Sequence, residues 1–364
     1  MDWTIVRTNL LSCSNDAHYP WLLIHALKMN EVKQRFANLD FLKIVAIYFV
    51  IVLHAMPIMV DKQNSLIYGI LNNIARFAVP CFFIMSGYFA GEKIIQNKLF
   101  FKTLKRILVL FLFWNFFYLM IPLNCSGLQK VGYLRIKYWD FYQIVTHPCK
   151  VLLQGFYGHL WYLESLALAF VYLFLTSKIS IKFVFGLALI QYIICVLGGG
   201  YSETGIGFHM PFTSRNGPFA SALFVSLGWY FSITKLKLPW QPSLLLVGIG
   251  FFTQYFEYIL LTSKFPRAIH YEFMFGTPIM AVGVFLLFLG FRSEQSFFSN
   301  LGNLSLGVYV LHVLVLDHIR YAIDITHLSI DNFMFFVLTV FVYLLSIGFS
   351  FLFSINSRLK LLVT

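Results

Sequence analysis

The chain alternates between long apolar runs and short polar connections. Ten runs approach or exceed the length of about 18 apolar residues with which a helix can cross a bilayer. They cover residues 39–60, 66–90, 105–123, 159–176, 183–199, 217–233, 243–262, 273–291, 301–319 and 332–355. The runs are long and show no strict alternation, so they predict helices. We therefore expect an all-α integral membrane protein with about ten transmembrane helices.

The distribution of positive charge predicts the orientation of these helices. Ten spans place both termini on the same side of the membrane. Sixteen lysines and arginines then fall on the side of the termini and nine on the opposite side. Cytoplasmic loops carry the excess of positive charge, so both termini are expected in the cytoplasm. The basic loop 122–158 is the weakest fit to this rule.

The composition supports a membrane protein and leaves little room for a second domain. The chain is 59% hydrophobic and 12% charged, with a mean hydropathy of +0.76. Soluble domains hold about 25% charged residues. The longest polar stretch, 122–158, is too short for a separate catalytic domain. The net charge of +12 follows the membrane topology, so we expect the lipid bilayer as a partner and no nucleic acid.

Two units are expected along the chain: a cytoplasmic amino-terminal segment at residues 1–34 and a membrane domain at residues 35–364. Residues 1–28 contain charges and Pro20 but no long apolar core, so they do not resemble a signal peptide. Met29 opens a charged stretch that leads directly into the first span. One hypothesis is that translation starts at Met29 and that residues 1–28 are a gene-model extension.

The five cysteines are scattered without a CxxC spacing, which gives no support to a zinc or redox motif. Cys125 and Cys149 fall in one loop and could pair in an oxidising compartment. Because sequence alone cannot define a disulfide, two unpaired thiols are favoured.

Lys43 and His54 are the strongest candidates for chemistry. Both lie in the first apolar run, where ionisable groups are costly and usually functional. Eleven positions make about three helical turns, so both side chains lie on one face of a helix, with His54 roughly 16 Å further along the axis. A lysine near the cytoplasm can hold the phosphates of an anionic ligand, and a histidine can act as a general base. The alternative is a snorkelling lysine and a histidine that hydrogen-bonds a neighbouring helix.

Arg76 is the corresponding candidate in the second run, at a depth similar to that of His54. A short loop joins the first two runs, so their helices are expected to be neighbours. Arg76 could hold a developing anion near His54, or it could snorkel to the surface. Pro80 follows four residues later and can kink the helix.

Weaker candidates lie in four other runs. The stretch from His159 through Trp161 and Tyr162 to Glu164 could orient an acceptor or form an interfacial aromatic belt. The remaining candidates are Glu257 and Glu272, near the outer ends of the seventh and eighth runs, and His312, which without further information is best explained by a structural hydrogen bond.

Four ordered segments resemble blocks of the acyltransferase-3 family of integral membrane acyltransferases: residues 35–54, 76–88, 158–162 and 305–312. The family has a basic residue, ten arbitrary residues and then histidine, which Lys43 and His54 match. Arginine is more common than lysine at the first position of this motif. Lysine lacks the planar guanidinium group with which arginine binds a partner through two parallel hydrogen bonds. The similarity runs from about residue 33 to the end. The chain looks most like short stand-alone bacterial members that O-acetylate surface glycans, such as the type acting on enterobacterial common antigen.

The resemblance implies transfer of an acetyl group from acetyl-CoA to a sugar hydroxyl of a cell-surface polysaccharide or its lipid-linked precursor, in the bacterial cytoplasmic (inner) membrane. Phosphates of the donor would be attracted by Lys43, Lys102, Lys105 and Arg106. His54 would be the general base or the acyl carrier, and Arg76 would stabilise the oxyanion. The expected catalytic residues are His54, Arg76 and Lys43, with no metal. The expected acceptor-binding residues are His159, Trp161, Tyr162, Glu164, Glu257, Glu272 and His312.

Two other functions fit the same pattern. A transporter or flippase of a glycan intermediate would also need many spans with buried charge. The same chemistry could use another donor, such as succinyl-CoA, or an amine acceptor. Uptake without consumption of a thioester would favour the transporter.

Overall fold

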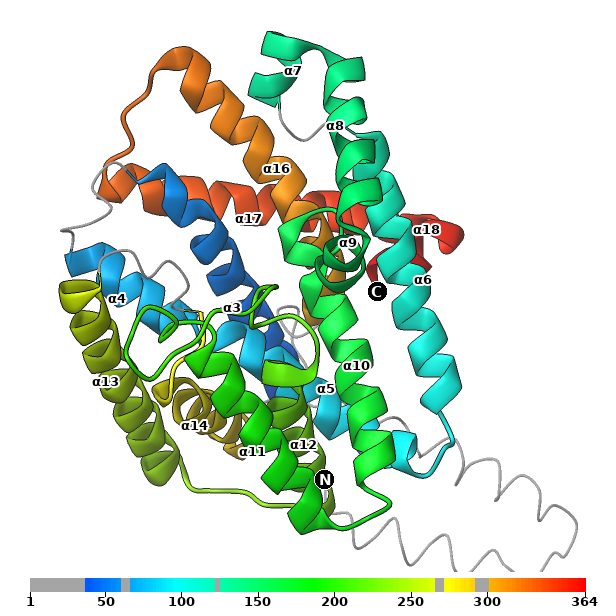
Figure 1. Cartoon of the computed structure of the whole chain (residues 1–364), viewed down its shortest axis with the longest axis vertical. Coiled ribbons are helices and arrows are strands. Elements are labelled where there is room, and N and C mark those ends of the chain that lie inside the picture. The colour runs from blue at the N-terminus through cyan, green and yellow to red at the C-terminus, as the bar shows by residue number, and fades with distance from the viewer. Residues whose placement is uncertain (1–36, 60–65, 122–124, 266–271, 292–300) are drawn as a thin grey trace, which may run out of the picture.

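The computed structural model describes residues 37–59, 66–121, 125–265, 272–291 and 301–364 (Figure 1). Throughout these ranges the regular elements are helices, which confirms the predicted all-α class. The predicted amino-terminal segment 1–34 and the proposed start at Met29 lie outside the described residues.

Each of the ten predicted runs falls on helical structure in the described ranges. Seven of the helices are long and apolar enough to cross a membrane. They are α3 (Ala37–Ala55) with η1 (Met56–Ile58), α4 (Leu66–Ala75) with α5 (Ala78–Ile95), α6 (Phe100–Met120), η2 (Gly158–Leu160) with α10 (Trp161–Thr176), α13 (Trp240–Lys264), η3 (Gly302–Leu304) with α16 (Ser305–Thr326), and α17 (Asn332–Ile355). Three shorter apolar helices complete the set: α11 (Ile181–Leu197), α12 (Pro218–Thr234) and α14 (Gly276–Gly290).

Four further helices lie between or after these runs. They are α7 (Cys125–Val131), α8 (Tyr133–Thr146), α9 (Pro148–Gln154) and α18 (Ser357–Val363). Hydropathy does not reveal them because their apolar and polar residues are mixed. Figure 1 shows α7 and α8 at the top of the view, level with the upper part of α16, which contacts α7. The apolar stretch 151–157 begins in α9 and continues into the bend that precedes η2.

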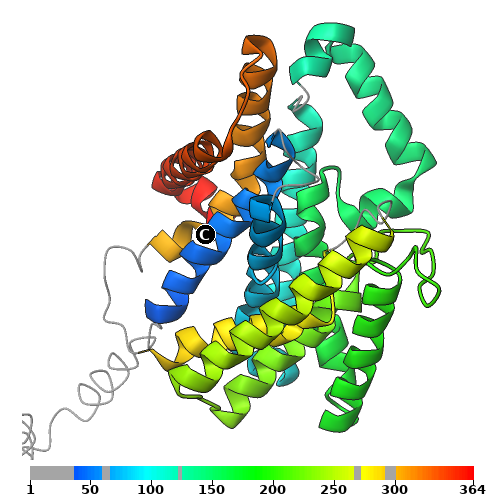
Figure 2. The same cartoon turned by 90° about the vertical axis from the view of Figure 1, so that its left-hand side faces the viewer.

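Helix α3 lies at the centre of the molecule. It packs against α4, α5, α14, α16 and α17 (Figures 1 and 2). Leu39, Leu42 and Ala46 of α3 are fully buried, whereas helices at the periphery turn large apolar side chains outward, such as Phe252 and Phe333. An exposed apolar surface of this kind is stable in lipid, not in water. The candidate residues Lys43 and His54 lie on this central helix, and each is partly exposed.

Glycines allow a close helix contact between α5 and α12. A Cβ atom on Gly87 would lie 2.0 Å from the main-chain oxygen of Val225. A Cβ atom on Gly228 would lie 1.9 Å from that of Ile84. Membrane helices gain little from burying apolar surface against one another, so small residues that permit backbone approach provide much of their packing energy.

The second predicted span is broken in the middle. Helix α4 ends at Ala75 and α5 begins at Ala78, which leaves Arg76 and Phe77 between them. Pro80 lies in the first turn of α5. Its ring would clash with the carbonyl oxygen of Arg76 in a continuous helix, and it has no N–H to bond that oxygen. The predicted kink at Pro80 is thus present, and it occurs at the predicted functional residue Arg76.

Candidate active site

Three histidines from separate elements gather near the far end of α3. His54 lies in the last turn of α3, His159 in η2 and His312 in α16. The ring centroids of His54 and His312 are 5.0 Å apart, and those of His159 and His312 are 5.7 Å apart. His159 and His312 are buried and His54 is half-buried. His54 is therefore the member of this cluster that a ligand can reach most directly.

The hydrogen bonds of His312 define its tautomer. Its Nδ1 atom lies 2.7 Å from the carbonyl oxygen of Tyr309 and 3.2 Å from that of Val308. Carbonyl oxygens only accept hydrogen bonds, so Nδ1 carries the proton. The Nε2 atom then holds a lone pair, and it is buried without a hydrogen-bond partner among the described residues. In its neutral form His312 thus offers one acceptor nitrogen beside His54.

A second contact from α16 holds the end of α3. Arg320 donates a hydrogen bond to the main-chain oxygen of His54. Carbonyl groups at the end of a helix lack an intrahelical partner, so this bond replaces the missing one. Helix α16 therefore contacts both the main chain and the ring of His54.

Arg76 occupies the break between α4 and α5, where buried amides surround it. Its guanidinium donates to the side-chain oxygen of Asn72 at 2.7 Å. Asn73 donates to the main-chain oxygen of Gly69 at 2.9 Å, and Gln254 of α13 donates to the main-chain oxygen of Asn73 at 2.9 Å. The sequence analysis missed these amides. Two consecutive asparagines within an apolar run, just before an arginine, are the signal that could have revealed them.

His54 and Arg76 line one small cavity of about 200 Å³, which we call the outer cavity. Trp161, Arg215 and Glu272 also line it. Apolar side chains complete the wall: Val50, Leu53, Val79, Pro80 and Phe273. The predicted residues His54, Arg76, Trp161 and Glu272 are thus brought together from four separate segments.

Arg215, which the sequence analysis treated only as a loop charge, is the additional functional candidate in the outer cavity. It forms an ion pair with Glu272, and its guanidinium lies 5.3 Å from the ring of Trp161. Helix α10 holds its segment: the Glu164 carboxylate accepts from the main-chain N–H of Gly217 at 3.3 Å. The polar sequence from Ser214 to Gly217, directly before an apolar run, was the available signal.

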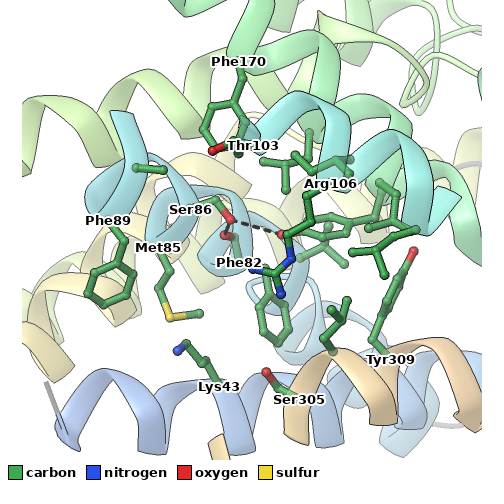
Figure 3. Close-up of a pocket in the computed structure, with 18 of the residues that line it drawn as sticks. Lys43, Phe82, Met85, Ser86, Phe89, Thr103, Arg106, Phe170, Ser305 and Tyr309 are labelled. Carbon is green, nitrogen blue, oxygen red and sulfur yellow. Dashed lines mark hydrogen bonds between the residues drawn. The ribbon is translucent and has the colours of Figure 1, made fainter. Parts of the chain in front are cut away.

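A larger cavity of about 610 Å³, which we call the inner cavity, opens along the other half of α3. Lys43, Lys102 and Arg106 line it, together with polar groups of Ser86 and Tyr309. Figure 3 shows the Lys43 amine and the Arg106 guanidinium entering this space from α3 and α6. Lys43 also pairs with Asp40 at 2.9 Å.

The two cavities share lining residues. Val50 of α3 and Val79 of α5 belong to the walls of both. Lys43 lies on the inner side of this pair of valines and His54 on the outer side. The helix face that carries Lys43 and His54 therefore leads from one cavity to the other.

The remaining predicted residues have other surroundings. Tyr162 lines the inner cavity, and its hydroxyl lies 3.3 Å from that of Ser86. Lys105 is exposed and belongs to the lining of neither cavity. Glu164 likewise lies outside both linings and supports the Arg215 segment.

Glu257 is engaged at the start of α14. Its carboxylate accepts from the main-chain N–H groups of Phe275 at 3.2 Å and Gly276 at 3.0 Å, and from the hydroxyl of Tyr201 at 2.7 Å. Burial and this carboxylate raise the pKa of Tyr201. A carboxylate at this position satisfies N–H groups that the helix leaves unpaired. Glu257 lies outside the linings of both cavities.

No metal centre or disulfide is found among the residues that the structure describes. No three histidine, cysteine, aspartate or glutamate side chains there are arranged to hold a metal ion. Cys125 and Cys149 are free thiols, as the sequence favoured.

Comparison with known proteins identifies related chains. The chain is 26% identical to the serine/alanine racemase of Enterococcus gallinarum over 296 residues, 76% of this chain and 40% of that protein. It is 26% identical to an amino-acid racemase of Enterococcus faecalis over 341 residues, 85% of this chain and 46% of that protein. The chain thus spans less than half the length of either relative. No solved structure matches it.

A family model described as an acyltransferase domain matches residues 36–355. This match covers the helices that form both cavities. The chain therefore belongs to the acyltransferase-3 family of membrane acyltransferases.

Proposed function

We propose that this protein moves an acetyl group from acetyl-CoA to a sugar hydroxyl of a cell-surface polysaccharide or its lipid-linked precursor. In this proposal it acts in the bacterial inner membrane, as a surface-glycan O-acetyltransferase. One observation carries the proposal: a cation-lined cavity and a histidine-lined cavity meet at Val50 and Val79. A donor and an acceptor can then approach His54 from opposite sides.

The inner cavity suits acetyl-CoA. Lys43, Lys102 and Arg106 supply positive charge for the phosphates, while most other lining residues are apolar and suit the extended pantetheine arm. About 16 Å of helix α3 separates Lys43 from His54, at 1.5 Å per residue. An extended arm with its phosphates near Lys43 would bring the thioester toward Val50 and Val79.

His54 is the proposed general base. It takes the proton from the acceptor hydroxyl while the hydroxyl oxygen attacks the thioester carbonyl carbon. The carbon–sulfur bond then breaks, the thiolate of CoA takes the proton from His54, and an acetyl ester remains on the sugar. If His54 instead carries the acetyl group, the same bonds break in two steps through an N-acetylimidazole.

Arg76 and His312 support this chemistry. The Arg76 guanidinium is held at the helix break and can stabilise negative charge on the thioester oxygen as the hydroxyl attacks. The lone pair of His312 Nε2 can accept an N–H of His54, which leaves the other nitrogen of His54 free to take a proton. His312 is thus proposed as a positioning residue.

Arg215, Glu272 and Trp161 are the proposed acceptor-binding groups of the outer cavity. A carboxylate and a guanidinium can together hydrogen-bond sugar hydroxyls, and an aromatic face packs against the apolar side of a sugar ring. The cavity is small, so we expect it to hold the single sugar that is modified.

A second candidate function is the binding or transport of a small amino acid. The outer cavity holds two arginines and one glutamate, which pair with a carboxylate and an ammonium group respectively. The two enterococcal relatives are named racemases, one of them for serine and alanine. A protein with this function would bind or transport serine without consuming a thioester.

The deciding experiment measures thiol release from acetyl-CoA by the purified protein in lipid, with glycan precursor from the host. We expect release that depends on the precursor and that transfers acetyl to it. His54→Ala should reduce the rate by about 100-fold or more, since general base catalysis contributes about 10²–10⁴-fold. His318→Ala is the matched control. His318 is an exposed histidine of helix α16, the helix whose His312 and Arg320 contact His54.

The outcomes separate the two candidates. Thiol release that accompanies acetylation of the glycan, and that is lost in His54→Ala but not in His318→Ala, supports the acetyltransferase. Serine uptake into vesicles without thiol release would reject it in favour of the amino-acid site. Release that survives the substitution would remove His54 from the mechanism.

A further inference from the structure

We propose that a third cavity, which we call the polar cavity, binds the sugar unit next to the one that is acetylated. The proposal rests on the proposed function and extends its acceptor site. The polar cavity measures about 660 Å³ and lies between helix α9 and the segment that joins α11 to α12. None of the catalytic or substrate-binding residues predicted from sequence lines it.

The lining of the polar cavity has a neutral buried part and a charged exposed part. Ser214 and Asn216 are buried, at 8% and 2% exposure. Lys150, Glu203 and His209 are exposed around them. Charges of both signs surround the opening, while amide and hydroxyl groups line the interior. Such an interior suits the neutral hydroxyls of a sugar better than a phosphate group, which would need concentrated positive charge.

Asn216 carries the strongest sign of a missing ligand. The Oδ1 atom of its side chain is buried and has no hydrogen-bond partner among the described residues. Buried polar atoms are nearly always hydrogen-bonded, because losing water without a replacement is costly. A sugar hydroxyl in the polar cavity would donate the missing bond.

The polar cavity is adjacent to the outer cavity. Arg215, which lines the outer cavity, stands in sequence between Ser214 and Asn216 of the polar cavity. Side chains of the two cavities also approach each other around Gly158. A Cβ atom there would lie 3.4 Å from the amide nitrogen of Gln154, which lines the polar cavity, and 3.9 Å from the guanidinium of Arg215.

Gly158 therefore lies between side chains of both cavities. An oligosaccharide with one sugar in the outer cavity can pass along this glycine and place its neighbour beside Asn216. The acceptor class is thus a neutral sugar chain of at least two units, bound in an extended form, in preference to a single sugar.

Cys149 provides a direct test of occupancy, because it is exposed and lines the polar cavity. The full chain would carry Cys13→Ser and Cys125→Ser, and the buried Cys81 and Cys195 would remain. The rate of Cys149 modification by N-ethylmaleimide is then measured with neutral oligosaccharide released from the host's surface glycan, with its component monosaccharides, and with inorganic phosphate.

We expect the oligosaccharide to slow modification of Cys149 several-fold, and the monosaccharides and phosphate to have little effect. Asn216→Leu should abolish this protection, because leucine has a similar volume and no amide. It should also raise the KM for the oligosaccharide about tenfold, and leave the KM for acetyl-CoA unchanged. Gln154→Leu, on the opposite wall, should show the same pattern if Asn216→Leu does not fold.

The other results overturn the proposal in defined ways. Protection by phosphate alone would assign the cavity to an anion. Acetyl transfer to the oligosaccharide with no protection, and with an unchanged KM in both variants, would reject the subsite and keep the acetyltransferase. Protection without acetyl transfer to any acceptor would keep the sugar site and reject the proposed function.

Discussion

His54 and His312 show how two residues of different predicted importance become one unit. His54 stood out because an ionisable group in a central apolar run is costly. His312 was best explained, from sequence alone, by a structural hydrogen bond, and it does make one through Nδ1. The other nitrogen of the same ring is left beside His54, at a ring distance of 5.0 Å. A structural hydrogen bond through one nitrogen and the proposed positioning of His54 through the other are therefore compatible in this residue.

A double-mutant cycle tests whether His54 and His312 act together. We expect His54→Ala to lower kcat by about 100-fold or more, and His312→Ala by about tenfold with an unchanged KM for the acceptor. The double variant should be no slower than His54→Ala, because His312 acts only through His54. Rates are measured as acetyl transfer in lipid.

Independent effects that multiply in the double variant would contradict this coupling. Partial recovery in His312→Gln, whose side chain offers an oxygen acceptor near the original Nε2 position, would further support it. His318→Ala serves as the control for histidine replacement on α16.

Helices α4 and α5 form one predicted span that is interrupted at Arg76 and Phe77. The hydropathy pattern predicts one span from residue 66, and the two helices together form it. The break exposes backbone groups at Arg76, which buried amides from α4 and α13 surround. Non-helical backbone at membrane depth is tolerated only where protein or a cavity encloses it.

Replacing Pro80 tests the importance of the break. In Pro80→Ala the ring clash with the carbonyl of Arg76 disappears and a main-chain N–H becomes available, so the two helices can join. We expect equal or higher thermal stability in detergent and up to about 100-fold slower acetyl transfer, because Arg76 would turn away from His54. Pro239→Ala, at the N-cap of α13, is the control. Full activity with the break removed would show that Arg76 needs no special backbone.

The contact between α5 and α12 gives a second prediction at this scale. Gly228→Ala would place a methyl group 1.9 Å from the main-chain oxygen of Ile84, so the helices would have to separate. We expect a loss of about 1–3 kcal/mol in stability, the usual cost of overpacking. Gly186→Ala on α11 is the matched control, since its new methyl group would meet open space. Thermal unfolding of both variants, followed by helical content, measures the difference.

At the scale of the whole molecule, the inner and outer cavities divide the site into two chambers. Val50 and Val79 stand where the chambers meet, and all the cationic groups proposed for the donor lie on one side of them. In the proposed mechanism, this arrangement would keep the large nucleotide part of the donor away from the glycan. In that mechanism the acetyl group would pass from one chamber to the other at Val50 and Val79.

Blocking this passage should uncouple donor binding from transfer. Val79→Trp would fill the space between the chambers. We expect acetyl transfer to fall by about 100-fold, since small displacements of reacting groups have effects of that size. CoA should still bind through its phosphates at Lys43, Lys102 and Arg106, with a much smaller change in Kd. Val109→Trp, on the exposed face of α6, is the control. Normal transfer in Val79→Trp would mean that the acetyl group reaches His54 by another route.

The sequence by itself determined the class of the protein, the positions of its apolar helices and its leading candidate residues. Bilayer thickness sets the length of an apolar run, and the cost of buried charge makes Lys43, His54 and Arg76 conspicuous. Both signals are local and depend on no neighbour in space. They also carried the likeness to the family that the chain belongs to.

Only the tertiary structure decided which polar groups meet. Arg215 and Asn72 were not singled out from sequence, yet the fold brings Arg215 into the cavity of His54 and pairs Asn72 with Arg76. The fold also directs Glu257 to the end of a helix and leaves Lys105 outside the cavities. Hydropathy indicates how deep a residue lies in the membrane. It does not indicate which neighbouring helix the residue faces. Rotation and packing of helices depend on contacts between distant residues, which no local pattern contains.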